Sequence, residues 1–98
     1  MMIVTMPHGR FNAALKDGSV QAKMKKILEA NKPEAAYFTE VNGKRTGFLV
    51  VDVADPSKIP SLAEPWFLTF EADVEFKIAM TPEDLGKAGL DEVAKKWM

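Results

Sequence analysis

Apolar and polar residues alternate over residues 73–80, near the end of the chain. The apolar positions of this stretch are Val74, Phe76, Ile78 and Met80. Alternation with a period of two is typical of a strand that buries one face, so the pattern predicts a strand over 73–80. A short apolar run over 2–6 stops at Pro7-His8-Gly9 and predicts a first strand that enters a loop there.

A helical spacing dominates residues 11–31. Its apolar positions are Val20, Met24, Ile27 and Leu28, and Asn31-Lys32-Pro33 ends the pattern. Asp17-Gly18-Ser19 interrupts the helix, because glycine costs about 1 kcal/mol relative to alanine in a helix interior. Two interpretations remain open: the helix begins at Ser19, or an earlier turn over 11–16 joins it through a kink.

Asn42-Gly43 joins two predicted strands, 35–41 and 44–53. Asn-Gly favours the tight hairpin turn that needs positive φ at both central residues. A two-residue loop sets Glu40 opposite Arg45 and Tyr37 opposite Phe48. We therefore expect a cross-strand ion pair and an aromatic pair, each a small stabilising contact.

Prolines divide the segment that follows the hairpin. Asp55-Pro56-Ser57 predicts a helix start, and Pro60 and Pro65 predict two short helical pieces, 59–64 and 65–70, rather than one helix. After the last strand, Thr81-Pro82 predicts a C-terminal helix. Ala88-Gly89 is expected to break this helix before a second amphipathic segment continues to the end.

The predicted elements follow the order strand, helix, strand, strand, helix, strand, with a C-terminal helix added. This is the order of a ferredoxin-like α+β domain, with an antiparallel sheet and both main helices on one face. Right-handed crossovers place the strands in the order fourth, first, third, second. Ninety-eight residues suffice for one domain, spanning 1–98.

The sheet face without helices is expected to be apolar as well. Leu49 and Val51 fall on one side of the third strand and Phe48 and Val50 on the other, with Tyr37 beside Phe48. A sheet face in contact with water is normally polar. The pattern therefore predicts a homodimer packed sheet to sheet; the alternative is a monomer whose C-terminal helix folds back over this face.

Net charge and composition exclude several functions. A net charge of −1 and a sequence pI near 5.8 argue against a protein that holds nucleic acid by charge. Residues 10–32 carry six basic and two acidic residues, which indicates a solvated helix face. Of the third-strand motif of RNA-recognition domains, only Lys44, Gly47 and Phe48 remain, so we expect no nucleic-acid partner.

Cysteine is absent, which excludes a disulfide scaffold, a thiolate nucleophile and a cysteine–zinc site. With one histidine and no ligand spacing, no metal and no cofactor are predicted. The longest apolar run is four residues, and the first residues lack the features of a signal peptide. We therefore expect no membrane contact and a cytoplasmic location.

Few residues suggest chemistry. His8 is the one candidate for a catalytic acid or base, and the alternative is a solvated loop histidine. The candidate residues of a substrate pocket are Tyr37, Phe48, Asp52, Trp66 and Phe70, although aromatic residues of a small domain also serve as plain core. Glu40 and Arg45 could bind an anion, or form only the cross-strand pair.

Four segments resemble small bacterial proteins of the dimeric α+β barrel superfamily. The segments are residues 32–38, 42–45, 59–65 and 80–85. The resemblance implies two sheets that form a barrel across a homodimer, with a pocket between sheet and helices. Members include cofactor-free monooxygenases, muconolactone-isomerase-like enzymes, haem-handling proteins and proteins without an assigned task, and no active-site residue carries over to this chain.

These observations lead to three functional hypotheses. The first is a homodimeric protein that binds a small hydrophobic molecule and whose biochemical activity is unknown. The second is a cofactor-independent enzyme, monooxygenase- or isomerase-like, that acts on a small hydrophobic or aromatic compound with His8 as acid or base. The third is a regulatory or scaffolding domain that binds another protein through an edge strand.

Overall fold

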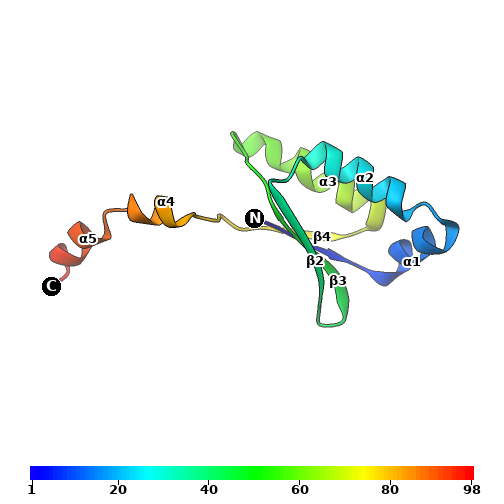
Figure 1. The fold of residues 1–98 in the computed structure, drawn as a ribbon, viewed down its shortest axis with the longest axis horizontal. Coiled ribbons are helices and arrows are strands. Elements are labelled where there is room, and N and C mark those ends of the chain that lie inside the picture. Colours follow the sequence, from blue (N-terminus) through cyan, green and yellow to red (C-terminus); the bar gives the residue numbers. More distant parts are fainter.

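The computed structural model describes all residues, 1–98, and has four antiparallel strands in one sheet (Figure 1). The strands are β1 (Met2–Met6), β2 (Ala35–Val41), β3 (Lys44–Val50) and β4 (Asp73–Phe76). Their order in the sheet is β2-β3-β1-β4, which is the order expected from the sequence. The α+β class is therefore confirmed.

The hairpin of β2 and β3 has the predicted register. Tyr37 lies opposite Phe48 and Glu40 opposite Arg45, and the turn residues Asn42 and Gly43 have φ of 53° and 77°. The predicted contacts across this register are wrong. The Glu40 carboxylate accepts a hydrogen bond from the Gly43 backbone N–H at 2.8 Å instead of pairing with Arg45. The aromatic ring pairs of the fold lie elsewhere, at Phe11–Phe70 and Trp66–Phe70.

Two helices precede the hairpin, so the interpretation with an earlier helical segment is confirmed. α1 (His8–Asp17) ends at Gly18, whose φ of 82° lies in the left-handed region, and α2 (Val20–Asn31) begins two residues later. The expected loop at Pro7-His8-Gly9 is wrong. Pro7 is extended and stands immediately before the first helical residue, so the chain turns from β1 directly into α1.

The segment over 59–70 forms one helix, α3 (Ile59–Phe70), after a single 3-10 turn over Pro56–Lys58, so the prediction of two pieces is wrong. Pro65 inside the helix costs about 3 kcal/mol. Burial of Trp66 and Phe70, which are 0% and 1% exposed, contributes about 1.5–3 kcal/mol for each side chain. Packing on the sheet thus outweighs the cost of the proline.

α1, α2 and α3 lie on the same side of the sheet (Figure 1), and the core fills the space between. The largest fully buried side chains are Trp66, Phe70, Met2, Met6, Leu49, Val4 and Thr46. The other face of the sheet carries no helix, and we call it the open face. Its exposed aromatic residue is Tyr37, which is 71% exposed.

Two strands are shorter than predicted, and both end where their partners end. β3 stops at Val50, which pairs with Ala35, the first residue of β2. β4 stops at Phe76, which pairs with Met2, and two further main-chain hydrogen bonds join Lys77 and Met1. No neighbouring strand is left for 51–53 or 78–80, so alternation alone does not produce a strand there.

Residues 77–98 form an arm that leaves the domain (Figure 1). The arm contains α4 (Pro82–Gly86), which begins with the predicted Thr81 cap, and α5 (Leu90–Lys96). The radius of gyration is 17.2 Å, whereas a compact domain of this length has about 13 Å. The arm therefore does not fold back over the open face, which was the monomeric alternative.

None of these helices has the length and apolar character needed to cross a membrane.

Candidate functional site

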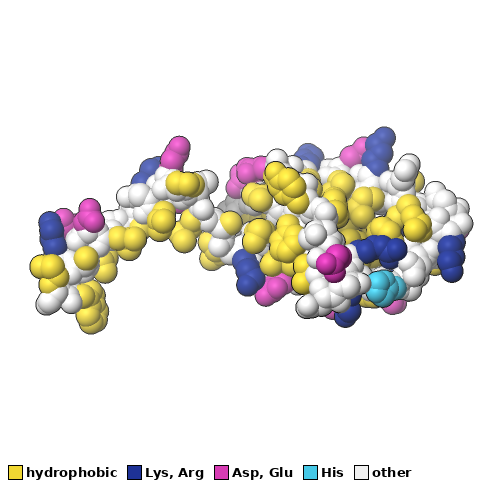
Figure 2. Space-filling view, turned by 60° about the horizontal axis from the view of Figure 1, so that its bottom comes forward, with side chains coloured by type: hydrophobic (Ala, Val, Ile, Leu, Met, Phe, Trp, Pro, Cys, Tyr) yellow, Lys and Arg dark blue, Asp and Glu magenta, His cyan; other side chains and the backbone are white.

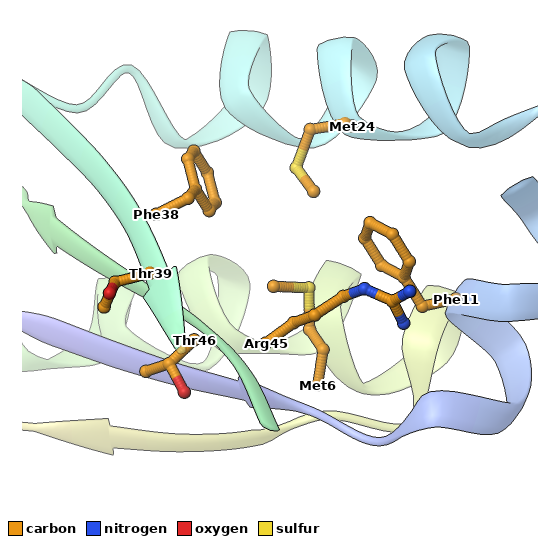
Figure 3. A pocket seen from close by; sticks show the side chains of 7 residues that line it. All are labelled: Met6, Phe11, Met24, Phe38, Thr39, Arg45 and Thr46. Carbon is orange, nitrogen blue, oxygen red and sulfur yellow. The ribbon is translucent and has the colours of Figure 1, made fainter. Parts of the chain in front are cut away.

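A cavity opens between the hairpin and the helices (Figure 3). We call it the hairpin cavity, and its volume is about 320 Å³. It is lined by Met6, Phe11, Met24, Phe38, Thr39, Arg45 and Thr46. Five elements contribute to the lining, namely β1, α1, α2, β2 and β3. Two thioethers and two phenyl rings make the lining largely apolar, and one guanidinium adds a positive charge.

The hairpin register places two of these side chains. Phe38 pairs with Gly47 and Glu40 with Arg45, so Phe38 and Arg45 lie on the sheet face covered by helices. A Cβ atom at Gly47 would lie 3.0 Å from Cε1 of Phe38. The missing side chain at Gly47 thus lets the Phe38 ring approach the backbone of β3 closely, at the edge of the hairpin cavity.

Arg45 is held by two contacts from α1. Its Cζ lies 4.3 Å from the centroid of the Phe11 ring, and its Nη1 donates a hydrogen bond to Oδ1 of Asn12 at 2.9 Å. A guanidinium over an aromatic face is a favourable cation–π arrangement. Figure 3 shows the Arg45 side chain running along the cavity toward Phe11. These contacts fix the direction of the one charged group in the lining.

Two of the predicted pocket residues belong to the core. Trp66 and Phe70 lie on α3, are buried, and line neither the hairpin cavity nor the two other cavities described below. The Trp66 indole Nε1–H donates to Oδ1 of Asn31 at 2.8 Å, and Nδ2 of Asn31 donates to the Leu62 carbonyl at 3.2 Å. Asn31 is 5% exposed, so this small network joins α2 to α3 inside the protein.

The other three predicted pocket residues lie apart from the hairpin cavity. Tyr37 is exposed and Phe48 half-buried, and both lie on the open face. Asp52 is exposed and follows β3, where it borders a space of about 620 Å³ at the base of the arm. The structure therefore does not bring the five predicted residues together.

His8, the predicted acid or base, is exposed at the start of α1. Its imidazole makes no side-chain hydrogen bond and no ion pair, and it does not line the hairpin cavity. No neighbouring polar group orients it for proton transfer, which general acid or base catalysis requires.

None of the seven lining residues of the hairpin cavity was predicted as a pocket residue, although Arg45 was named as a possible anion-binding residue. The sequence pattern could have placed two of them, Phe38 and Arg45, on the helical face of the sheet. The register that sets Tyr37 on the open face sets Phe38 on the helical face by period two, and Arg45 shares the face of Phe38. The contribution of Phe11 depends on where α1 packs, which periodicity does not indicate.

The two remaining large cavities are weaker candidates. One, of about 540 Å³, lies between α2 and α3 and is bordered by exposed basic side chains, among them Lys23 and Lys26. The other is the space beside Asp52, which is bordered by the arm itself. No group of three or more histidine, aspartate or glutamate side chains lies close enough together to hold a metal ion.

Comparison of the chain with protein-family models, with curated proteins and with solved structures finds no match. The candidate site is consequently defined by its geometry alone: an apolar space under the hairpin with one oriented guanidinium.

Proposed function

We propose that this protein is a homodimer that binds a small hydrophobic molecule in the hairpin cavity. The observation that carries the proposal is the apolar lining of a space of about 320 Å³ between sheet and helices. Ligand sites have volumes from about 300 Å³ upward, so the ligand is small. Met6 and Met24 are flexible thioethers that adapt their shape to a bound molecule.

Exposed apolar surface supports the homodimer. On the open face Tyr37 is 71% exposed, and Ile3, Phe48 and Val50 are half-buried. The arm exposes a further seven large apolar side chains: Ile78, Met80, Leu85, Leu90, Val93, Trp97 and Met98. Figure 2 shows hydrophobic side chains along the length of the arm. An apolar surface this extensive is typical of a protein interface rather than of a monomer in water.

The strand order and the three helices on one face support a ferredoxin-like arrangement, in which the open faces of two copies pack together as a dimeric barrel. The arm supports the same assembly. α4 and α5 have five and seven residues, and isolated helices this short are unstable in water. A partner that buries their apolar side chains would stabilise them, and a second copy of the chain can supply such a surface.

The enzyme alternative with His8 as acid or base receives less support. The imidazole is exposed, has no polar partner and lies outside the lining of the hairpin cavity. Binding therefore accounts for the geometry better than catalysis at His8 does.

The binding proposal is tested with methionine methyl groups as probes. We expect benzyl alcohol, a small neutral aromatic compound, to shift the NMR signals of the Met6 and Met24 methyl groups in a saturable titration. Met80 and Met98, which are 65% and 99% exposed, are internal controls whose signals stay unchanged. If the cavity signals do not move, or if all methyl signals move together, the cavity does not bind small hydrophobic molecules.

The dimer proposal is tested by a charge on the open face. Tyr37→Asp introduces an unpaired carboxylate into the proposed interface, and we expect sedimentation velocity at micromolar concentration to change from a dimer to a monomer. Leu68→Asp is the matched control, because Leu68 is 68% exposed on α3, on the helical side. A wild-type chain that sediments as a monomer, or an unchanged dimer with Tyr37→Asp, would contradict the proposal.

A further inference from the structure

We infer that the ligand of the hairpin cavity is a small apolar or aromatic monocarboxylate, bound through its carboxylate by Arg45. This inference rests on the proposed function and adds the chemical class of the ligand. It is drawn from the charge, the contacts and the surroundings of Arg45. The binding of an uncharged hydrophobic molecule does not require the charge of Arg45.

The charge of Arg45 has no carboxylate partner. The four ion pairs of the structure join other residues, and none includes Arg45. Glu40, directly opposite on β2, accepts a hydrogen bond from the turn N–H of Gly43. Arg45 is half-buried, and its only polar side-chain partner is the neutral Asn12. A half-buried cation beside an apolar cavity is thus left without an anion.

The guanidinium is nevertheless held in place. The cation–π contact with Phe11 and the hydrogen bond to Asn12 hold it, and Nη1 is the only nitrogen that makes a protein hydrogen bond. A guanidinium has five N–H donors, and two parallel donors match the two oxygens of a carboxylate. Because Arg45 is already ordered, less conformational entropy is lost when an anion binds.

The remaining lining determines the rest of the ligand. Met6 lies next to Arg45, and Met24 and Phe38 lie across the cavity from it (Figure 3); all three offer apolar contacts to a ring or a short chain. No second basic residue belongs to the lining. One cation balances one negative charge, so the cavity suits a monocarboxylate better than a phosphate ester or a dicarboxylate.

The experiment compares benzoate with benzyl alcohol, its neutral counterpart, by the methyl signals of Met6 and Met24 at pH 7. We expect benzoate to bind about tenfold more tightly or better, since hydrogen bonds to charged groups are the stronger ones. Asn12→Asp places a carboxylate beside Arg45 as an internal counter-ion. This variant should lose the preference for benzoate and bind benzyl alcohol as before. Gln21→Glu, an equal charge change at an exposed position of α2, is the matched control.

A second variant covers the case in which Asn12→Asp does not fold. Arg45→Met removes the charge and keeps an apolar stem, and it should also reduce benzoate binding to the level of benzyl alcohol. Equal binding of both compounds to the wild-type protein would overturn the inference, while still supporting the proposal that the cavity binds small hydrophobic molecules. The inference also fails if Asn12→Asp and Arg45→Met keep the benzoate preference. Binding of neither compound would contradict the proposed function itself.

Discussion

The hydrogen bond between Asn31 and Trp66 gives the sharpest prediction of stability. Replacing Asn31 by leucine keeps a side chain of similar size and removes the acceptor of the Trp66 indole N–H. Trp66 is 0% exposed, so no water replaces the lost acceptor. The variant leaves a buried donor unpaired at the contact between α2 and α3.

The expected loss follows from this geometry. The hydrogen bond from the indole N–H to Asn31 is short, at 2.8 Å, and fully buried. Leaving such a donor without an acceptor costs about 1–3 kcal/mol. The second bond, from Asn31 to the Leu62 carbonyl, is longer at 3.2 Å and is part-buried, so we assign most of the loss to the first. A loss of this size is a substantial part of the roughly 5–15 kcal/mol that stabilises a typical domain.

Urea unfolding followed by far-UV circular dichroism measures this loss, at one fixed protein concentration because association would add to the stability. Gln21→Leu, an exposed polar-to-leucine change on the same helix, is expected to stay within about 0.5 kcal/mol of the wild type. In a Trp66→Phe background, which lacks the N–H donor, Asn31→Leu should cost distinctly less. A loss below about 0.5 kcal/mol for Asn31→Leu, or an equal loss in both backgrounds, would refute the reasoning.

Two further predictions concern the hairpin and Asp55, which caps the 3-10 turn that precedes α3. Gly47→Ala should lower the free energy of unfolding by about 1–3 kcal/mol, because the new Cβ lies 3.0 Å from Phe38 and 3.2 Å from Leu49, and Leu49 is fully buried and cannot move away. Gly86→Ala, with nothing within 4 Å, should be neutral or slightly stabilising in the same urea assay. Donation from the Ser57 backbone N–H at 2.9 Å, and then from its hydroxyl, holds the pKa of the Asp55 carboxyl below its ordinary value of 3.8. The pKa of Asp55 is therefore lower in the folded than in the unfolded protein. The contribution of this cap to folding stability is fully present above the unfolded pKa and is lost as the pH falls through the folded pKa. An NMR titration of the Asp55 carboxyl with a midpoint at or above 3.8 would contradict this.

Local patterns predicted most elements whose partners lie close in the sequence. The Asn42-Gly43 turn determines the register of β2 and β3, because only a two-residue loop with positive φ at both positions closes this hairpin. Thr81 and Asp84 form the capping box at the start of α4 from residues three apart. Such features depend on interactions within a few residues, so they can be deduced without knowing the rest of the fold.

The continuous helix α3 is the clearest case in which local rules were insufficient. Pro65 predicts a break, yet Ala63, Trp66 and Phe70 are buried together against the sheet. The energy gained by packing these side chains exceeds the cost of the proline. The ends of β3 and β4 were likewise determined by where the neighbouring strands end and not by their own alternation.

The candidate site was less accessible to sequence analysis than the fold. Period two on β2 and β3 places Phe38 and Arg45 on one face, but it does not indicate that Phe11 from α1 lies under the guanidinium. That contact joins residues 34 positions apart and depends on how α1 packs against the hairpin. The ion pair expected between Glu40 and Arg45 does not form, because each side chain bonds to another group. Glu40 accepts a hydrogen bond from the Gly43 N–H, and Arg45 donates one to the Asn12 side-chain oxygen.

The amino-acid sequence by itself determined the α+β class, the order of the strands and the hairpin register, because these follow from periodicity, turn chemistry and chain connectivity. Only the tertiary structure decided that α3 is continuous, that the arm leaves the domain and that a cavity with an uncompensated cation lies under the hairpin. Each of the latter depends on side chains distant in sequence that compete for the same space and the same hydrogen-bond partners. That competition is resolved only when all elements pack together.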